Sequence, residues 1–308
     1  MSIVVTGATG HLGRLVIEGL LAAHVPAGEI AAVVRDKEKA ADLAERGLEL
    51  RIADYDAPDT LRGVFAAGDR VLLISGSEVG RRVPQHRAVV DAAREAGVAL
   101  LAYTGVLGGP DADFDLAAEH KVTEQLILDS GLPYTFLRNG WYHENYTEHL
   151  APVLEHGAVV ASAGEGRVAS AARADYAAAA VAVLTGEGHE GRVYELSGDV
   201  AWSFAEYAAV VAAQSGKDIS YANVPAEQHL AVLTGAGLPE ALAAVLVDVD
   251  AAIARGRLAG TNGELARLIG RPTTGIAEAV SAAVSAALSA AVSASPKGWP
   301  PPVMSVSG

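Results

Sequence analysis

The sequence contains no cysteine among its 308 residues. Disulfides, thiolate nucleophiles and cysteine metal ligands are therefore excluded. No apolar run reaches the roughly 18 residues that a membrane helix needs, and the first residues lack the basic segment and apolar stretch of a signal peptide. These absences predict a cytoplasmic protein without a membrane span.

Positive charge is also scarce, because 23 Lys and Arg stand against 37 Asp and Glu, for a net charge of −14. An acidic surface repels phosphate backbones, so we expect no nucleic-acid partner. The sequence has no Gly-x-Ser-x-Gly elbow, no His-Glu-x-x-His and no P-loop. His143 and His149 are six residues apart and would face different ways on a helix, so we expect no metal site.

Three glycines near the N-terminus are the most informative feature that is present. Gly7, Gly10 and Gly13 follow the apolar run 3–5, and a helical pattern begins directly behind them. This order is typical of a dinucleotide-binding turn, in which the backbone approaches a pyrophosphate and Gly13 lets the helix pack closely on the strand. The alternative is a glycine turn in an unrelated α/β protein. The predicted cofactor contacts in this segment are Gly7, Thr9, Gly10, His11, Leu12 and Gly13.

The first half of the chain alternates between apolar strands and helical patterns. We expect strands at 3–5, 30–34, 48–52, 71–74, 99–103 and 134–137, with helices near 12–23, 37–46, 58–66, 84–96 and 117–130. Asp56 and Pro58 read as the cap and first turn of the third helix, and Gly97 and Gly131 as helix ends. The pattern predicts an α/β fold with a Rossmann-type, doubly wound parallel sheet.

The residue at the end of the second strand indicates which dinucleotide binds. Arg35 occupies the position where NAD-specific folds carry an acid, and a guanidinium suits the 2′-phosphate of NADPH. Asp36 competes for this role, or else caps the next helix. Asp54 ends the third strand and either touches the adenine edge or is a turn residue. Ser75, Gly76 and Thr104, near the ends of the next two strands, complete the predicted cofactor contacts.

The pattern changes at about residue 139, without a linker. We expect a nucleotide-binding domain at 1–138 and, at 139–280, a smaller α+β substrate lobe that packs on it and shares some elements with it. Residues 281–308 combine an Ala/Ser helix with a Pro-rich tail. Val280, Val284, Leu288 and Val292 recur every fourth residue, which indicates either a docked or oligomer-forming helix or a loosely ordered tail. Residues 296–308 are expected to be disordered.

Several longer segments resemble the NmrA-like family of atypical short-chain dehydrogenases/reductases, and among them the bacterial NADPH-dependent quinone oxidoreductases. The resemblance rests on the glycine turn, on Arg35 and on the segments 73–80, 119–124, 132–146, 172–177 and 188–196. It runs in order from residue 2 to about residue 280. It implies a reductase that uses NADPH and binds its acceptor in a cleft.

The chain departs from the usual short-chain dehydrogenase pattern at the proton-donating residues. Leu116 and His120 stand where these enzymes carry Tyr and Lys, and Gly105 lies where Ser is usual. Hydride transfer to a simple ketone makes a strongly basic alkoxide and gains from a positioned acid. A reduced quinone is a phenolate-type anion whose pKa is near 10, so it can leave and take its proton from water. The missing acid therefore favours quinone-like acceptors.

The candidate acceptor residues follow the sixth strand. Aromatic rings and a carboxamide suit a flat acceptor with a carbonyl oxygen, although Trp141 and Tyr142 would also serve as core between the lobes. His120 is expected either to orient the nicotinamide ribose or donate a proton, or simply to be a buried helix residue. The predicted catalytic residues are His120, Asn145 and Tyr146, and the predicted acceptor contacts are Asn139, Trp141 and Tyr142.

The sequence thus predicts an NADPH-dependent reductase of quinone or other aromatic acceptors. A non-catalytic NADP(H)-binding redox sensor that acts through a protein partner is the alternative. A larger, polyketide-like quinone is a third possibility, because residues 105–110 carry little side-chain bulk. Arg173 and Asp175 are expected to tie the two lobes together.

Overall fold

The computed structural model describes residues 1–294, with side chains up to residue 287. The prediction of disorder at 296–308 lies outside the described residues. So do the side chains of Leu288 and Val292 from the four-residue repeat. None of the described helices is both long enough and apolar enough to cross a bilayer.

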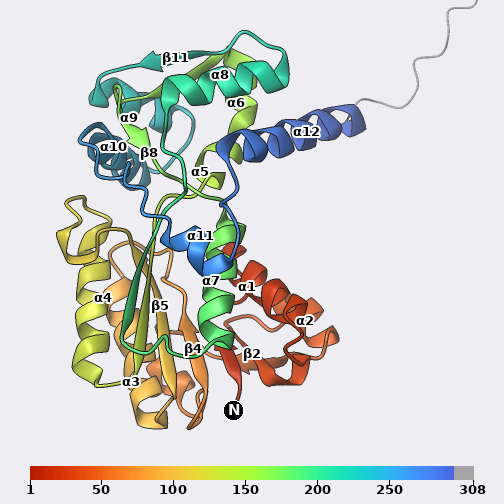
Figure 1. The fold of residues 1–308 in the computed structure, drawn as a ribbon, viewed down its shortest axis with the longest axis vertical. Coiled ribbons are helices and arrows are strands. Elements are labelled where there is room, and N and C mark those ends of the chain that lie inside the picture. Colours follow the sequence, from red (N-terminus) through yellow and green to blue (C-terminus); the bar gives the residue numbers. More distant parts are fainter. Residues whose placement is uncertain (295–308) are drawn as a thin grey trace, which may run out of the picture.

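A seven-stranded sheet with the order β3-β2-β1-β4-β5-β6-β9 forms the centre of the lower part of the molecule in Figure 1. All six strand pairings in it are parallel. The strand order reverses direction beside β1, as in a doubly wound fold. The predicted Rossmann-type architecture is therefore confirmed. The strands are β1 (Ile3–Val5), β2 (Ile30–Val34), β3 (Glu49–Ile52), β4 (Arg70–Leu73), β5 (Leu100–Val106), β6 (Tyr134–Asn139) and β9 (Arg192–Leu196).

Helices cover both faces of this sheet. Helices α1 (His11–Ala22) and α7 (Arg173–Thr185) bury one face, and α3 (Arg82–Ala96) and α4 (Ala117–Ser130) bury the other. Val5 belongs to the first cluster and its neighbour Val4 to the second, because successive side chains of a strand point to opposite faces. Short apolar runs such as 3–5 are thus buried on both sides, as parallel strands generally are.

The edge strand β9 comes from the segment assigned to the substrate lobe. It pairs with β6, and α7 packs on the same face as α1, so the chain from Arg173 to Leu196 completes the nucleotide-binding layer. Helix α11 (Glu264–Ile269) adds Leu265 to the same core. The two parts share these elements, and a boundary at residue 138 does not separate them in space.

The second lobe lies above the carboxyl ends of the sheet strands (Figure 1). It has a parallel pair, β7 (Ala158–Ala161) with β11 (Ser220–Asn223), and an antiparallel pair, β8 (Arg167–Val168) with β10 (Trp202–Ser203). Its helices are α5 (Glu144–Thr147), α6 (Leu150–His156), α8 (Phe204–Ser215), α9 (Ala226–Gly235), α10 (Glu240–Ala254) and α12 (Ile276–Ala294).

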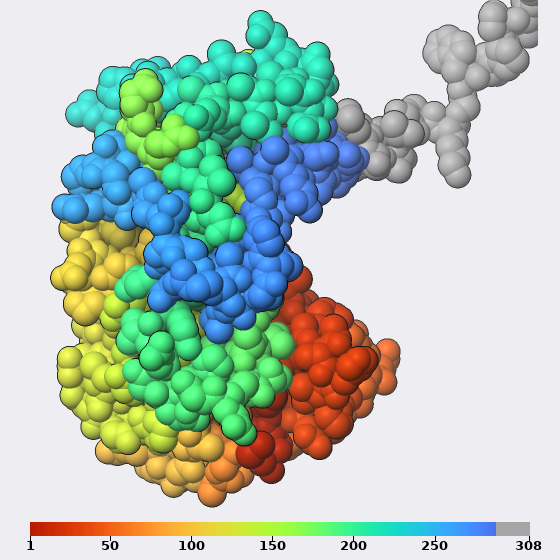
Figure 2. Space-filling model, viewed as in Figure 1, coloured from red at the N-terminus to blue at the C-terminus, as the bar shows by residue number. Residues whose placement is uncertain are grey.

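Helix α12 is docked at its start. Val280 and Val284 are buried in the core of the second lobe, and Ile276 packs beside them. The first half of the four-residue repeat therefore forms a contact face. Figure 2 shows the surface hollowed between α12 and the segment that contains α1 and α2 (Ala41–Glu45).

One predicted helix is much shorter than expected. The segment 58–66 forms only a 3₁₀ turn, η3 (Pro58–Leu61), because Gly63 has a positive φ of 72° and ends it. Asp56 does not cap this turn, since its carboxylate accepts a hydrogen bond from Nη2 of Arg81 at 2.9 Å. The other 3₁₀ turns are η1 (Ala27–Glu29), η2 (Glu38–Ala40) and η4 (Gly109–Asp111).

The glycine signals at two other helix ends are confirmed. Gly97 and Gly131 end α3 and α4 in the left-handed conformation, with φ of 67° and 71°. A residue without a Cβ adopts this conformation at little cost.

Candidate cofactor and acceptor site

The glycine turn joins β1 to α1 at the carboxyl edge of the sheet. Gly7 has a φ of 58°, and the amide of Gly10 donates to its carbonyl at 2.9 Å. A Cβ on Gly13 would collide with that same carbonyl and would lie 2.8 Å from Cα of Ala8. Gly13 thus lets α1 approach the turn, as the sequence predicted.

The N-terminus of α1 presents unpaired hydrogen-bond donors. The N-cap is Gly10, which offers no side chain, and no acid occupies the first turn. The backbone N–H groups of His11, Leu12 and Gly13 have no partner within residues 1–294. Such a terminus favours an anion, because its N–H groups and the helix dipole act together. The donor set fits the pyrophosphate of a dinucleotide.

The side chain of Arg35 is accessible to a ligand. It is 66% exposed and contacts Glu78 at 3.4 Å. Asp36 is occupied elsewhere, because its Oδ1 accepts the amide of Glu38 at 2.9 Å. Asp36 therefore caps the following turn, which leaves Arg35 as the charged group available at the end of β2.

The other predicted cofactor residues also lie at the carboxyl ends of the strands. The amide of Ser75 donates to Oγ1 of Thr104 at 2.9 Å, and the amide of Gly76 donates to Nε2 of His86 at 3.0 Å. Asp54 is a turn residue, since its Oδ1 accepts the amide of Asp56 at 3.0 Å.

Tyr55 is a further residue at this edge that the sequence reasoning did not select. Burial raises the pKa of its phenol to about 12, although the neighbouring Thr6 and the backbone of Gly7 act to lower it. The only sequence signal was its place directly after the third strand.

His120 belongs to a buried polar cluster below this edge. Its Nδ1 lies 2.7 Å from the phenol oxygen of Tyr103, and Nδ1 of His86 lies 2.9 Å from Oγ1 of Thr123. Burial, followed by the charge of Arg82, lowers the pKa of His120 to about 3. His120 is therefore neutral at ordinary pH, which suits a hydrogen-bonding role better than that of an acid.

Asn139 and Tyr142 bond to each other between the two lobes. Nδ2 of Asn139 lies 3.3 Å from the Tyr142 oxygen, and the guanidinium of Arg173 lies 5.3 Å from the centre of the Tyr142 ring. Asn139 is buried, and Tyr142 packs edge-on against Tyr176 of α7. These contacts support the core interpretation of Tyr142 that the sequence left open.

Asn145 and Tyr146 occupy α5 and differ in their surroundings. The Tyr146 ring packs edge-on against Trp202 and Phe204, with distances of 4.9 and 5.5 Å between the ring centres. Burial, followed by the charge of Asp250, raises its pKa well above 10. The side-chain amide of Asn145 is half-buried and has no hydrogen-bond partner in the described part of the chain. It is available to a ligand.

Charged residues join α5 to the start of α7. Arg173 Nη1 lies 2.8 Å from Glu148, and the backbone N–H of Arg173 donates to both carboxylate oxygens of Glu144. The pKa of Glu148 is lowered: burial opposes this, but the bond to Arg173 and the charges of Arg173 and His11 outweigh it. The contribution of His11 to this pKa indicates that α5 faces the start of α1.

The buried Asp175 of α7 connects this helix to the segment that precedes α12. It accepts the amide of Thr274 at 2.8 Å and pairs with Arg271 at 2.7 Å. Arg173 and Asp175 thus connect the lobes, as expected.

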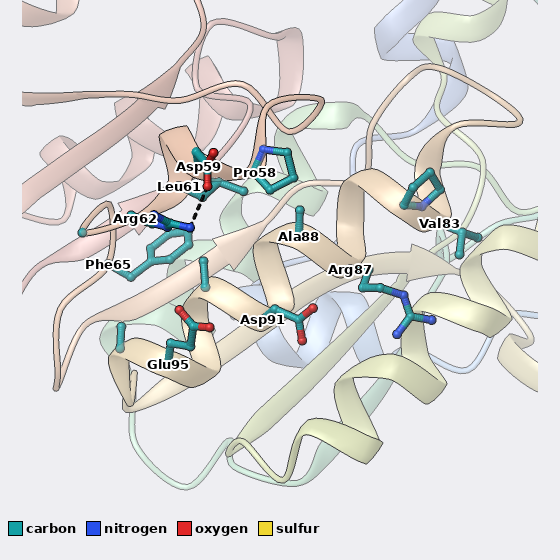
Figure 3. Close-up of a pocket in the computed structure, with 14 residues that line it drawn as sticks. Pro58, Asp59, Leu61, Arg62, Phe65, Val83, Arg87, Ala88, Asp91 and Glu95 are labelled. Carbon is teal, nitrogen blue, oxygen red and sulfur yellow. Dashed lines mark ion pairs between the residues drawn. The ribbon is translucent and has the colours of Figure 1, made fainter.

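Two cavities lie away from these candidate residues. A groove of about 660 Å³ runs along η3 and the outer face of α3, with charged residues such as Arg87, Asp91 and Glu95 on its wall (Figure 3). A second hollow of about 520 Å³ lies between the turn 163–167 and the end of α10. Neither contains a predicted site residue, and neither lies at the carboxyl ends of the parallel strands, where nucleotides bind.

Comparison with known proteins identifies the family. A model of the NAD(P)H-binding family matches residues 7–187. The chain belongs to the NAD(P)H-binding family. The chain is also similar to quinone oxidoreductase 2 of Escherichia coli, with 48% identity over 279 residues, covering 91% of this chain and 97% of that protein. The resemblance drawn from the sequence motifs is therefore confirmed.

Two solved structures extend the comparison. The E. coli NADPH-dependent quinone oxidoreductase QOR2 in complex with NADPH superposes with a TM-score of 0.88 at 48% identity, covering 91% of this chain and 99% of that chain. Triphenylmethane reductase of Citrobacter sp. in complex with NADP(H) has a TM-score of 0.88 at 42% identity, covering 92% of this chain and 100% of that chain.

Proposed function

We propose that this protein is an NADPH-dependent reductase that transfers a hydride to quinone-like acceptors. The observation that carries the proposal is its 48% identity, over 91% of the chain, to a protein whose structure is described as an NADPH-dependent quinone oxidoreductase. The redox-sensor alternative gains no comparable support, since this relative is named for its activity.

The cofactor would be held by the features at the sheet edge. The free N–H groups of His11, Leu12 and Gly13 would bind the pyrophosphate, and Arg35 would pair with the 2′-phosphate through its exposed guanidinium. The cofactor would also contact the residues at the ends of the next two strands, namely Ser75, Gly76 and Thr104. NADPH supplies the hydride, and the protein positions the acceptor against it.

The acceptor would lie between the glycine turn and α5. The half-buried amide of Asn145 has no partner among the described residues and can donate to a carbonyl oxygen of the acceptor. Trp141 and Tyr146 offer ring faces to a flat substrate. With Leu116 in place of the usual Tyr and a neutral His120, the site lacks the standard acid pair. This deficit suits acceptors whose reduced form is a weakly basic phenolate.

The test is the loss of NADPH absorbance at 340 nm with a panel of quinones. We expect turnover with NADPH, weak turnover with NADH, and at least a tenfold loss of kcat/KM in Asn145→Ala, since an amide hydrogen bond to a developing charge contributes roughly 1.5–3 kcal/mol. The control is Gln214→Ala, which removes an exposed amide from α8. Tight NADPH binding without turnover on any acceptor would instead support the redox sensor.

Three further properties stay predictions from the sequence. They are a cytoplasmic location, self-association, and the absence of nucleic-acid partners. Gel filtration with light scattering would measure self-association.

A further inference from the structure

An ion pair joins two strands that are not neighbours at the nucleotide-binding edge of the sheet. Arg35 directly follows β2, and Glu78 lies in the loop between β4 and α3. The strand order places β1 between β2 and β4, so the two residues start from opposite sides of β1. Their side chains nevertheless meet, with Nη1 of Arg35 3.4 Å from Oε1 of Glu78. The pair therefore bridges from one side of β1 to the other.

The strand that this pair spans leads into the glycine turn. β1 ends at Val5, and Thr6 connects it to Gly7. The amide of Ile74, the first residue after β4, donates to Oγ1 of Thr6 at 3.1 Å. A Cβ on Gly7 would lie 3.6 Å from Cβ of Ile74. The loop that carries Glu78 thus starts directly beside the turn that would hold the pyrophosphate.

The contact between Arg35 and Glu78 is weak. A charge-assisted hydrogen bond of this kind is usually about 2.7–2.9 Å long, whereas this one measures 3.4 Å. The side chain of Arg35 is 66% exposed and that of Glu78 39%, so water screens their attraction. Arg35 has no other ion pair or hydrogen bond in the described part of the chain. A stronger anion can therefore take the guanidinium without breaking any other contact.

Glu78 keeps two further partners when Arg35 changes its own. Nε2 of Gln85 donates to Oε2 of Glu78 at 3.3 Å, and Nη1 of Arg81 lies 3.7 Å from the same oxygen. Gln85 belongs to α3 and is only 5% exposed, so it is a fixed donor. Asp56 in turn holds Arg81, 2.9 Å from its Nη2. The carboxylate is thus held from the side of α3, independently of Arg35.

We propose that Glu78 is a specificity-determining residue that competes with the 2′-phosphate of NADPH for Arg35. The proposal rests on the function proposed above, in which Arg35 binds this phosphate. In the free protein the carboxylate of Glu78 occupies the guanidinium. A phosphate monoester carries about 1.5 to 2 negative charges near pH 7, so it displaces the single charge of the carboxylate. Glu78 then remains with Gln85 and Arg81.

This exchange separates the two dinucleotides. The 2′-hydroxyl of NADH is neutral and cannot replace a carboxylate on a guanidinium, so the Arg35–Glu78 pair stays closed and Arg35 adds nothing to the affinity. For NADPH, the gain is the difference between the new ion pair and the pair that it breaks. Glu78 therefore lowers the affinity for the phosphorylated dinucleotide. Each turnover ends with the release of oxidised cofactor, and the returning carboxylate offsets the loss of the phosphate contact at that step.

The test measures binding of the phosphate itself, without turnover. Adenosine 2′,5′-bisphosphate carries the 2′-phosphate, and adenosine 5′-monophosphate lacks it. By calorimetric titration, we expect Glu78→Gln to bind the bisphosphate about twofold to fivefold more tightly than the wild type, which is the range of an exposed ion pair. Its affinity for the monophosphate should not change. Glu95→Gln removes the same charge from an exposed residue near the far end of α3 (Figure 3) and should change neither affinity.

A double-mutant cycle measures whether the effect depends on Arg35. In the Arg35→Gln background, Glu78→Gln should lose most of its effect on the bisphosphate, since the contested guanidinium is gone. An equal gain in both backgrounds would mean that Glu78 only repels the phosphate through space, and the competition would be disproved.

Two further results would overturn the proposal alone. Weaker binding of the bisphosphate by Glu78→Gln would show that Glu78 positions Arg35 for the phosphate instead of competing with it. Unchanged binding would show that Glu78 does not occupy Arg35 in solution. A wild type that binds the bisphosphate no more tightly than the monophosphate would contradict the preference for NADPH in the proposed function, and the competition would fall with it.

Discussion

The phenol oxygen of Tyr103 lies 2.7 Å from Nδ1 of His120, and both side chains are buried between α4 and the sheet. His86 completes this cluster from α3, where its Nε2 accepts the amide of Gly76. Because a backbone N–H can only donate, Nε2 of His86 is unprotonated, and its Nδ1–H donates to Thr123. The cluster thus fixes a neutral His86 directly under the cofactor edge.

These histidines predict a loss of stability in acid. Burial and then Arg82 lower the pKa of His86 to about 4, and that of His120 is about 3. The pKa of an unfolded histidine is near 6.5, so at pH values below about 6.5 the unfolded chain binds more protons than the native chain. The contribution of each histidine to the free energy of unfolding is complete above pH 6.5. It falls as the pH drops towards 4, by up to about 1.4 kcal/mol per pH unit.

Urea unfolding at pH 7, 6 and 5 measures this effect. We expect a shallower fall of the unfolding free energy in His120→Gln than in the wild type. His156→Gln, which changes an exposed residue, is the control and should keep the wild-type slope. Identical slopes in His120→Gln and the wild type would show that the pKa of His120 is not lowered in the native protein.

A second prediction concerns the glycine turn. Gly13→Ala places a methyl group against the carbonyl of Gly7, so α1 must shift. We expect a loss of about 1–3 kcal/mol in unfolding free energy, as for other overpacked sites, and at least a tenfold weaker binding of NADPH. Gly28→Ala is the matched control, because an added Cβ would meet no heavy atom within 4 Å there and the φ of Gly28 is not positive. Calorimetric titration with NADPH measures the affinity, and unchanged binding in Gly13→Ala would contradict the pyrophosphate assignment.

A third prediction concerns Arg35. Replacement by Gln removes the charge proposed to bind the 2′-phosphate, and we expect the KM for NADPH to rise roughly tenfold to fiftyfold while that for NADH changes little. Stability should change by less than about 0.5 kcal/mol, because exposed ion pairs such as Arg35–Glu78 contribute little. Arg62→Gln, at another exposed arginine, should leave both KM values unchanged. Equal losses with both cofactors would exclude Arg35 as the selective residue.

Much of the fold was predictable from local signals. Buried parallel strands are short apolar runs, and Gly97 and Gly131 mark helix ends through their backbone conformation. The place of β9 was not predictable in this way. It is an edge strand with exposed residues at Arg192 and Val193, so its sequence resembles a lobe strand, and its pairing with β6 depends on chain path rather than on pattern.

The parts of the candidate site that are formed by residues close together in the sequence were predictable. The contacts between residues far apart in the sequence were not. The contacts of Gly7 to Gly13 lie within one turn, and Arg35 ends a recognisable strand. In contrast, Glu148 and Arg173 lie 25 residues apart, beside α5 and in α7. No spacing in the sequence joins them.

The last prediction concerns Arg138, whose guanidinium links β6, α4 and β9. Its Nε and Nη2 bond to the two oxygens of Glu124 at 2.8 and 2.7 Å, and Nη1 bonds to Glu195 at 2.7 Å. Glu124 is only 4% exposed. Both carboxylates raise the pKa of Arg138, with the hydrogen bond to Glu124 as the largest cause. The two carboxylates therefore hold the guanidinium of Arg138 in a fixed geometry.

Arg138→Met leaves the carboxylate of Glu124 buried without its partner. We expect a loss of about 3–5 kcal/mol in unfolding free energy, which is the usual cost of an uncompensated buried charge. The double variant Arg138→Met/Glu124→Gln should recover part of this loss, because the stranded charge is gone. A cycle of urea unfolding on the wild type, both single variants and the double variant isolates the coupling. A loss below about 1 kcal/mol in Arg138→Met would mean that water reaches Glu124, and that the contact between β6, α4 and β9 is held by packing rather than by this ion pair.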